Sequence, residues 1–326
     1  MLVQLRVAVP ADRTRAVRAV FEEDPGTAHL AVLPGASVRP AGDLVLAEVA
    51  RESADDLVTA LRELGVDDDG AITIEGIDAA ISRRAEEAER AAPGDGSDAV
   101  VWEQVIRTVA ADSAPSVSFL VFLTVATLLA AIAVVTDSAV LVVGAMVLGP
   151  EFSPLAGLAL AVVHRRRGLA RSAAVTLVGG FLVAIALTAL AGLAARGLGW
   201  IGPELLTAER PQTGFITSPD KWSLVVAVLA GIAGTLSLTS AKSTALVGVF
   251  ISVTTVPAAG AMALGAALGS GAAIGEAATQ LGVNLAGILV AATATLAVQG
   301  SLWRRVPRIT PRVAAVRAPG GGSPRG

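Results

Sequence analysis

The sequence has no cysteine and no tyrosine, and it has only two histidines among 326 residues. The absence of cysteine excludes disulfides, thiol nucleophiles and thiolate metal sites. His29 and His164 lie far apart and neither has neighbouring ligand residues, so we expect no metal site and no cofactor. Charged residues are also scarce, at 16%, whereas 53% of residues are hydrophobic and the mean hydropathy is +0.67. These values are typical of membrane proteins.

The few charges are divided unevenly along the chain. Residues 1–98 contain 20 acidic residues and 10 arginines, a net charge of −10, whereas the remaining 8 acids and 15 bases give +7. The arginine clusters lie beside apolar stretches and do not form a groove-sized basic face. The composition therefore does not predict nucleic-acid binding.

Residues 1–76 are expected to form a small cytoplasmic α+β domain. "LVQLRVAV" alternates apolar and polar residues, and a helical stretch "ADRTRAVRAVFEE" follows. "TAHLAVLP" and "GDLVLAEVA" resemble strands, "SADDLVTALREL" has helical spacing with Ser53 as the expected N-cap, and "AITIEG" closes the pattern. The order βαββαβ predicts a ferredoxin-like domain. By analogy, such a domain binds a small ligand, pairs with itself, or serves only for packing and assembly.

Residues 77–116 connect this domain to the apolar half. We predict a charged helix at about 77–91, followed by the linker "APGDGSD". "AVVWEQVIRTVAADS" then has the apolar spacing of an amphipathic helix. We expect that helix to lie on the cytoplasmic membrane surface.

Residues 117–303 contain six apolar stretches, each close to the roughly 20 residues that a bilayer core requires. The second and fifth are the least regular as helices. Residues 304–326 form a basic tail that we expect to be disordered and cytoplasmic. The predicted spans are 117–136, 138–163, 169–195, 222–241, 243–268 and 278–300.

The basic residues predict the orientation of these spans. They gather in "HRRRGLAR" between spans two and three, at Lys242 between spans four and five, and in the C-terminal tail. Six spans place all three segments on one side, and that side is cytoplasmic by the excess of positive charge. We therefore expect a prokaryotic inner-membrane protein with both termini in the cytoplasm.

Two stretches resemble each other, "DSAVLVVGAMVLGPEFSPLAGLAL" and "KSTALVGVFISVTTVPAAGAMAL". Each has an aliphatic run that reaches a glycine and is interrupted by proline about ten residues later. If the likeness reflects a repeat, the spans form two units of three. The odd number forces the second unit to insert upside down, as in many secondary transporters.

Proline within a span frees backbone carbonyls, which membrane interiors tolerate only beside protein partners or a water-filled cavity. Glu151 lies in the first such interruption, where an ionised side chain costs about 3 kcal/mol or more. It is a candidate proton or cation ligand. Alternatively, it pairs with Lys242 or an arginine, or it lies near the headgroups. The candidate substrate- or ion-binding residues are Gly144, Gly149, Pro150, Glu151, Pro154, Thr254, Pro257 and Asn284, and Lys242 and Asp137 are candidates for ion pairing or gating.

The stretches "DSAVLVVGAMVLGPEFSPLAGLALAV", "ALVGVFISVTTVPAAGAMAL" and "LGVNLAGIL" resemble an uncharacterised prokaryotic multi-pass membrane family, domain of unknown function 389. The resemblance covers about residues 100–300. This sequence departs from the family pattern with Glu151 and Phe152 after Pro150, where apolar residues are commoner. The resemblance implies a membrane topology and no particular chemistry.

Two functions fit these observations. The first is a transporter or channel for an ion or small solute, with a polar site at the broken helices and a regulatory or assembly domain in the cytoplasm. The second is a non-transporting sensor or scaffold whose soluble domain binds a ligand or partner. We expect no enzymatic activity, because no paired carboxylates, serine–histidine pair, metal cluster or phosphate-binding loop is visible at suitable spacing. Broken helices and a self-pairing domain favour a homo-oligomer.

Overall fold

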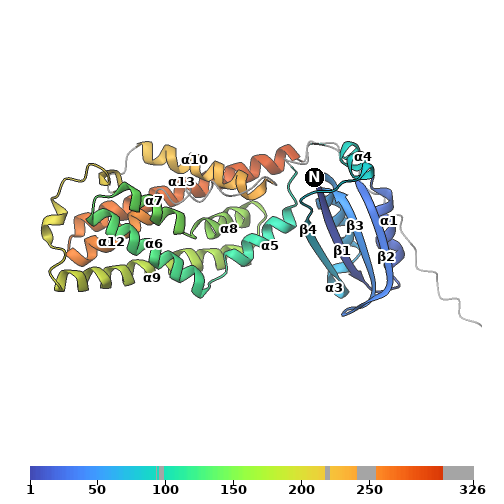
Figure 1. The fold of residues 1–326 in the computed structure, drawn as a ribbon, viewed down its shortest axis with the longest axis horizontal. Coiled ribbons are helices and arrows are strands. Elements are labelled where there is room, and N and C mark those ends of the chain that lie inside the picture. The colour runs from blue at the N-terminus through green and yellow to red at the C-terminus, as the bar shows by residue number, and fades with distance from the viewer. Residues whose placement is uncertain (93, 95–98, 217–220, 241–254, 304–326) are drawn as a thin grey trace, which may run out of the picture. The chain divides into compact units, whose positions relative to one another are not determined.

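The computed structural model describes residues 1–92, 94, 99–216, 221–240 and 255–303. They separate into two compact units, Met1–Trp102 and Glu103–Trp303, shown in Figure 1. The first half of the predicted fifth span and the C-terminal tail lie outside the described residues, as do the candidates Lys242 and Thr254.

The first unit contains a four-stranded sheet in the order β2-β3-β1-β4, with every neighbouring pair antiparallel. Strands and helices follow one another as βαββαβ, which confirms the predicted order, and a short helix α3 precedes the last strand. Such a central pair of strands flanked by the two others is the arrangement of the split βαβ unit. The elements are β1 (Leu2–Val9), α1 (Thr14–Glu23), β2 (Thr27–Val38), β3 (Ala41–Ala50), α2 (Arg51–Glu63), α3 (Val66–Asp69), β4 (Ala71–Gly76) and α4 (Arg83–Ala91).

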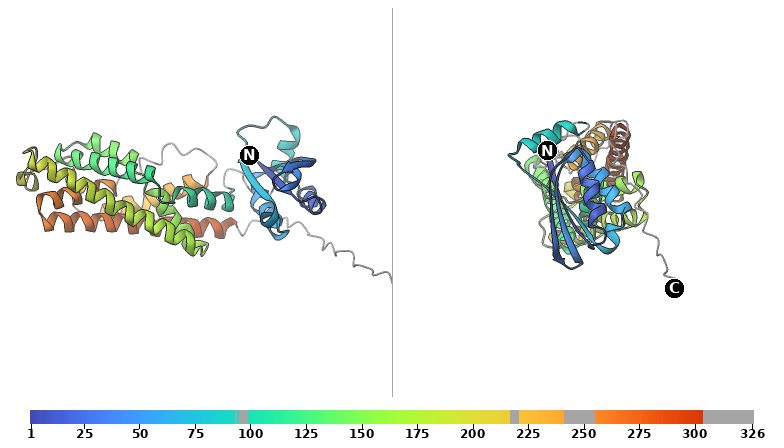
Figure 2. Two further views of the ribbon diagram at one scale, coloured as in Figure 1. Left: turned by 90° about the horizontal axis from the view of Figure 1, so that it is seen from below. Right: turned by 90° about the vertical axis from the view of Figure 1, so that its right-hand side faces the viewer.

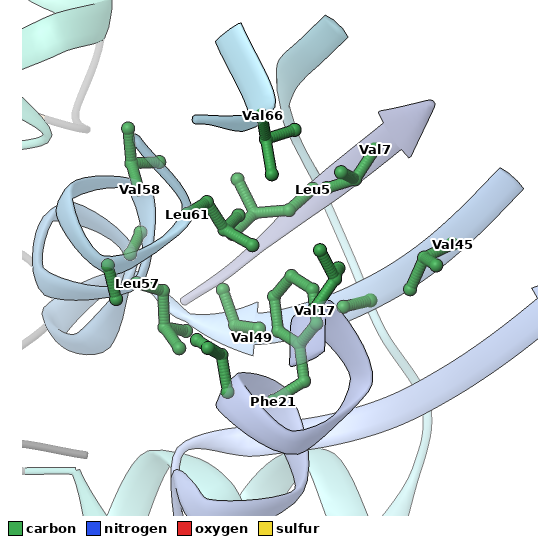
Figure 3. Packing of buried hydrophobic residues seen from close by; sticks show 14 of the residues in the cluster. Leu5, Val7, Val17, Phe21, Val45, Val49, Leu57, Val58, Leu61 and Val66 are labelled. Atoms are coloured by element: carbon green, nitrogen blue, oxygen red, sulfur yellow. The ribbon is translucent and has the colours of Figure 1, made fainter. Parts of the chain in front are cut away.

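Alternation along the strands divides the sheet into two faces. Val3, Leu5 and Val7 of β1 point into the core beneath α1 and α2, where Phe21 and Leu57 are fully buried (Figure 3). The opposite face is covered at one end by α4. There, a smaller cluster contains Leu2, Ala28, Ala85 and Ala88.

Two predicted helix starts in this unit are wrong. Ser53 is not an N-cap, because β3 passes directly into α2 and Ala50 occupies the cap position. Ser53 instead lies buried in the first helical turn. The charged helix begins at Arg83 and not near residue 77, because the Ser82 hydroxyl accepts a hydrogen bond from the backbone N–H of Ala85 and caps the helix there.

The described residues of the second unit form helices and connecting turns, and no strand. Four of its helices are long and apolar enough to cross a membrane, namely α6, α9, α10 and α13. The helices α7 and α8 pass the same test only as a pair, bent by 52° at a break, and form either a broken span or a re-entrant loop. α12 is apolar but shorter, and six spans therefore stay a prediction. The elements are α5 (Trp102–Asp112), α6 (Val117–Val135), α7 (Ala139–Leu148), α8 (Phe152–Val163), α9 (Arg167–Gly197), α10 (Lys221–Thr239), α12 (Val256–Leu268) and α13 (Gly271–Trp303), with short 3-10 turns at Pro203–Leu206 and Gly214–Ile216.

Helix lengths recur in the two halves of this unit. α6 and α10 each have 19 residues, α8 and α12 have 12 and 13, and α9 and α13 have 31 and 33. Packing recurs as well. α9 packs against α6, α8 and α12, whereas α13 packs against α10, α12 and α8. The long helices α9 and α13 run along the unit in Figure 2. If α6, α8 and α9 are exchanged with α10, α12 and α13, the same set of packed helix pairs results.

Two very short turns join the shorter helices to the long ones. Gly269 ends α12 with φ +75°, and the N–H of Ser270 donates to the carbonyl of Gly265 at 2.9 Å. Arg165 takes the same left-handed conformation after α8, with φ +54°. Glycine suits this position because it lacks a Cβ. α13 consequently begins at Gly271, seven residues before the predicted span.

Candidate functional site

The break in the second predicted span consists of Gly149, Pro150 and Glu151, between the end of α7 and the start of α8. Proline cannot donate a helical hydrogen bond, and it disfavours a helical conformation in the residue before it. Gly149 is accordingly extended, with φ −69° and ψ 120°. Pro154 is the third residue of α8, where a helix needs no internal N–H donor. The chain therefore breaks at Pro150 and continues helically through Pro154.

A second helix start lies at Thr255. This residue is the N-cap of α12, and Pro257 occupies the first turn, where its missing N–H again costs no internal hydrogen bond. Neither Glu151 nor Thr255 caps its own helix through its side chain. Both polar side chains are therefore available for another partner.

The structure brings these two helix starts together. The Thr255 hydroxyl donates a hydrogen bond to Oε1 of Glu151 at 2.5 Å, across 104 residues of sequence. Both residues have 0% exposure. The second carboxylate oxygen, Oε2, is also buried and has no hydrogen-bond partner among the described residues. The N-cap residues of two helices, whose N-termini carry a partial positive charge, are thus joined through one carboxylate.

Gly149 permits this close approach. A Cβ at position 149 would lie 2.3 Å from Oε2 of Glu151 and 2.9 Å from a methyl carbon of Val256. Glycine therefore leaves space for the carboxylate between the end of α7 and the start of α12.

Apolar side chains surround the pair. Ala145 of α7, Leu155 of α8 and Val256 and Ala259 of α12 belong to one buried cluster. The cluster also includes residues of α6, α9, α10 and α13. The carboxylate therefore lies in the interior of the helical unit, closed to solvent in this conformation.

Two other predicted site residues lie elsewhere. Gly144 sits within α7 against α6, where an added Cβ would make only an ordinary contact with Leu129. Asn284 is fully buried on α13, one turn after Gln280, whose Nε2 lies 3.5 Å from the Asn284 side-chain oxygen.

Asp137 lies in the turn between α6 and α7, where it has a left-handed backbone with φ 46°. Its Oδ1 accepts hydrogen bonds from the backbone N–H of Thr213 at 2.9 Å and from the Thr213 hydroxyl at 2.8 Å. The N–H of Gln212 donates to the same carboxylate. Asp137 therefore fastens the segment before α10, and within the described residues it forms no ion pair.

The candidate residues selected from the sequence include Thr254 but not Thr255. A signal was present, because threonine is a favoured N-cap and it precedes a proline placed in the first helical turn. Its contact with Glu151 has no local signal.

The sheet domain also contains a contact between a serine and a histidine that sequence spacing did not reveal. The hydroxyl oxygen of Ser82 lies 3.4 Å from Nε2 of His29, and Nδ1 of His29 lies 2.7 Å from Oε2 of Glu48. These contacts link the start of α4 to the sheet.

Metal ligands do not gather in the part of the chain that the structure describes, where no group of three or more histidine, aspartate or glutamate residues could hold an ion. The fold defines a protein with several membrane-like apolar helices, one pair of them bent at a break, preceded by a small antiparallel sheet domain.

The similarity to a known family lies in the helical unit. A model of the family described as "Domain of unknown function (DUF389)" matches residues 146–290, a segment that contains both Glu151 and Thr255. Through this segment the chain is similar to the DUF389 family, which supports the predicted resemblance. "Uncharacterized protein MJ0678" of Methanocaldococcus jannaschii is 28% identical over 138 residues, which cover 42% of this chain and 40% of that relative. No solved structure matches the chain.

Proposed function

We propose that the helical unit transports or conducts an ion or small solute, with its polar site where the starts of α8 and α12 meet. The observation that carries the proposal is the hydrogen bond between Thr255 and Glu151. Discontinuous helices commonly form such sites in transporters, because their free N–H and C=O groups and partial charges face a shared point.

The recurrence of helix lengths and contacts supports an inverted repeat. α8 and α12 hold equivalent places in the two halves, each immediately before a long helix. Glu151 and Thr255 are the N-caps of these two helices and touch each other. Equivalent positions meet when they lie on the axis that relates two repeats. The proposed site therefore coincides with that axis, as expected for two halves that rock against each other.

The burial of Glu151 supports a role for this carboxyl group in binding. An ionised carboxylate in an apolar interior is unfavourable unless a proton, a cation or several hydrogen bonds compensate it. Only one side-chain hydrogen bond reaches Glu151 from the described residues. A proton or a bound cation is therefore the species that the site would hold, and the conformation described is an occluded one.

Flux through proteoliposomes tests the proposal. We expect the purified full chain to move at least one species in a broad panel of ions and small solutes. Glu151→Gln should reduce this flux at least tenfold, because it removes the charge but keeps an acceptor for Thr255. Glu276→Gln is the matched control, since Glu276 is exposed on α13. Absence of flux across the panel, or an unchanged Glu151→Gln variant, contradicts the proposal.

A non-transporting sensor or scaffold is the second candidate. The closed apolar surroundings of Glu151 favour it, because the carboxylate could then serve only to lock α8 to α12. In that case Glu151→Gln would change neither flux nor ligand response. Labelling of Thr255→Cys by a water-soluble maleimide would separate the two, because cysteine is close to threonine in size and a scaffold never exposes this site.

The sequence predictions on orientation are carried into this proposal. We place both termini in the cytoplasm of a prokaryotic cell, with the helical unit in the inner membrane. Large apolar side chains on the outer surfaces of the helices fit contact with lipid, among them Val178, Leu182 and Leu190 of α9. A homo-oligomer stays a prediction.

A further inference from the structure

The first unit has a pocket of about 470 Å³ beside the edge strand β2, bounded by α1 and the start of α4. These three elements lie together in Figure 1. The volume falls in the range of small-molecule sites, about 300–1,000 Å³. Its lining residues are acidic, basic and apolar, with one uncharged polar residue, Thr27.

The apolar part of the lining comes from α1 and β2. Phe21 is fully buried beneath it, whereas Leu30 and Val32 are only partly buried against the core. Both leave part of their apolar surface uncovered by α1. A ligand with an apolar portion would complete this burial.

The basic part consists of Arg18 and Arg84. Arg18 is paired with Glu22 one turn later, at 2.7 Å. Arg84 lies in the first turn of α4 and has no ion-pair partner among the described residues. Its guanidinium is suited to a carboxylate, which it can bind through two parallel hydrogen bonds.

The acidic end of the pocket is buried. Asp24 is 6% exposed and accepts a hydrogen bond from the N–H of Gly26 at 2.7 Å, and burial raises its pKa. Next to it along the chain, the Thr27 hydroxyl is buried and has no hydrogen-bond partner among the described residues. An unpartnered buried hydroxyl is unfavourable, and a polar ligand group would satisfy it.

We propose that this pocket binds a free α-amino acid with an apolar side chain. The carboxylate would pair with Arg84, the ammonium group would reach the Asp24 and Thr27 end, and the side chain would cover Leu30 and Val32. The charges of Arg18 and Arg84 are balanced by those of Glu22 and Asp24. A pocket with no net charge is better matched to a zwitterion than to a simple anion or cation. The inference concerns the soluble unit alone and does not rest on transport by the helical unit.

Isothermal titration of the detergent-purified full chain with each of the twenty amino acids tests the proposal. We expect leucine, isoleucine, valine, methionine or phenylalanine to bind with a Kd below about 1 mM. Arg84→Gln should weaken binding at least tenfold. Arg83→Gln is the matched control and should bind like the wild type, because Arg83 is exposed on the same helical turn but does not line the pocket.

Analogues of the bound amino acid test the zwitterion requirement. For leucine, 4-methylpentanoate lacks the ammonium group and 3-methylbutylamine lacks the carboxylate, so each should bind at least tenfold more weakly. Thr27→Ser, which retains the hydroxyl, should bind like the wild type, whereas Thr27→Val should bind several-fold more weakly.

Three outcomes would overturn the inference. They are no binding by any amino acid, binding that Arg84→Gln leaves unchanged, and equal binding of leucine and 4-methylpentanoate. A change of oligomeric state in Arg84→Gln, without ligand binding by the wild type, would assign the pocket to a second copy of the chain. None of these results alters the flux expected of Glu151→Gln, so the two proposals fail separately.

Discussion

Oε1 of Glu151 accepts a hydrogen bond from the Thr255 hydroxyl at 2.5 Å, and this bond joins the start of α8 to the start of α12. Both side chains are wholly buried. Because each helix begins beside a proline, the contact joins two points where the regular backbone hydrogen-bond pattern is interrupted. Stability and proposed function therefore depend on the same pair of side chains.

Thr255→Val is expected to destabilise the helical unit. Valine has nearly the shape of threonine but cannot donate, so Glu151 would be left without its side-chain hydrogen bond. The cost should be about 1–3 kcal/mol, as for other buried polar groups that lose a partner. Thermal unfolding of the purified protein measures it. Thr255→Ser retains the hydroxyl and should lose much less, and equal stability of the valine variant would contradict the prediction.

Gly149→Ala is expected to displace the carboxylate of Glu151. The new methyl group would lie 2.3 Å from Oε2, so the side chain must move away from Thr255. We expect a lower unfolding temperature and a loss of flux similar to that of Glu151→Gln. Gly179→Ala is the control, since an added Cβ there meets no atom within 4 Å. A Gly149→Ala variant with wild-type flux would show that this position tolerates the shift.

Close contacts between helices should make other glycines sensitive to substitution by alanine. A Cβ at Gly260 of α12 would lie 2.8 Å from the backbone N of Ala131 on α6. Small residues allow membrane helices to approach in this way. Gly260→Ala should therefore lower the unfolding temperature, whereas Gly282→Ala has open space and should gain up to about 1 kcal/mol from helix propensity. Comparable melting of the two variants would contradict this account of the α6–α12 contact.

Single cysteines test the proposed orientation, because the natural sequence has none. Gly168→Cys lies at the start of α9, and Ala208→Cys lies in the exposed segment before α10. We expect a membrane-impermeant maleimide added to intact cells to label position 208 and not position 168. Lysed cells provide the control, since both thiols should then react. Labelling of position 168 from outside would reverse the orientation.

Asp24→Asn is expected to stabilise the sheet domain at neutral pH. Burial raises the folded-state pKa of Asp24 above 3.8, so the folded protein holds this proton more tightly than the unfolded chain. That contribution to stability is complete below about pH 3.8 and is lost as the pH rises through the folded-state pKa. Asparagine keeps an acceptor for the Gly26 N–H without the buried charge.

The pH dependence can be measured by amide hydrogen exchange of β1 and β3 in increasing urea, comparing variant and wild type at the same pH. The advantage of Asp24→Asn should be larger at pH 7 than near pH 4. An advantage that is the same at both values would show that the carboxylate is not the origin of the difference.

Local patterns predicted the elements better than their contacts. Alternating residues identified "LVQLRVAV" and "AITIEG" as strands, and the structure places strands at Leu2–Val9 and Ala71–Gly76. Pro150 indicated an interruption, because its effect on the backbone is local. The sequence does not reveal that Thr255 reaches Glu151, since a contact across 104 residues depends on how several helices pack. The same holds for His29 and Glu48, whose approach depends on the register between β2 and β3.

The tight turns after α8 and α12 limit how the protein could open. Only His164, Arg165 and Arg166 separate α8 from α9, and only Gly269 and Ser270 separate α12 from α13. Neither short helix can swing away alone without unwinding its turn. In the proposed transport cycle, a motion that parts Glu151 from Thr255 would therefore carry a whole hairpin, and each pair of helices would move as one rigid body.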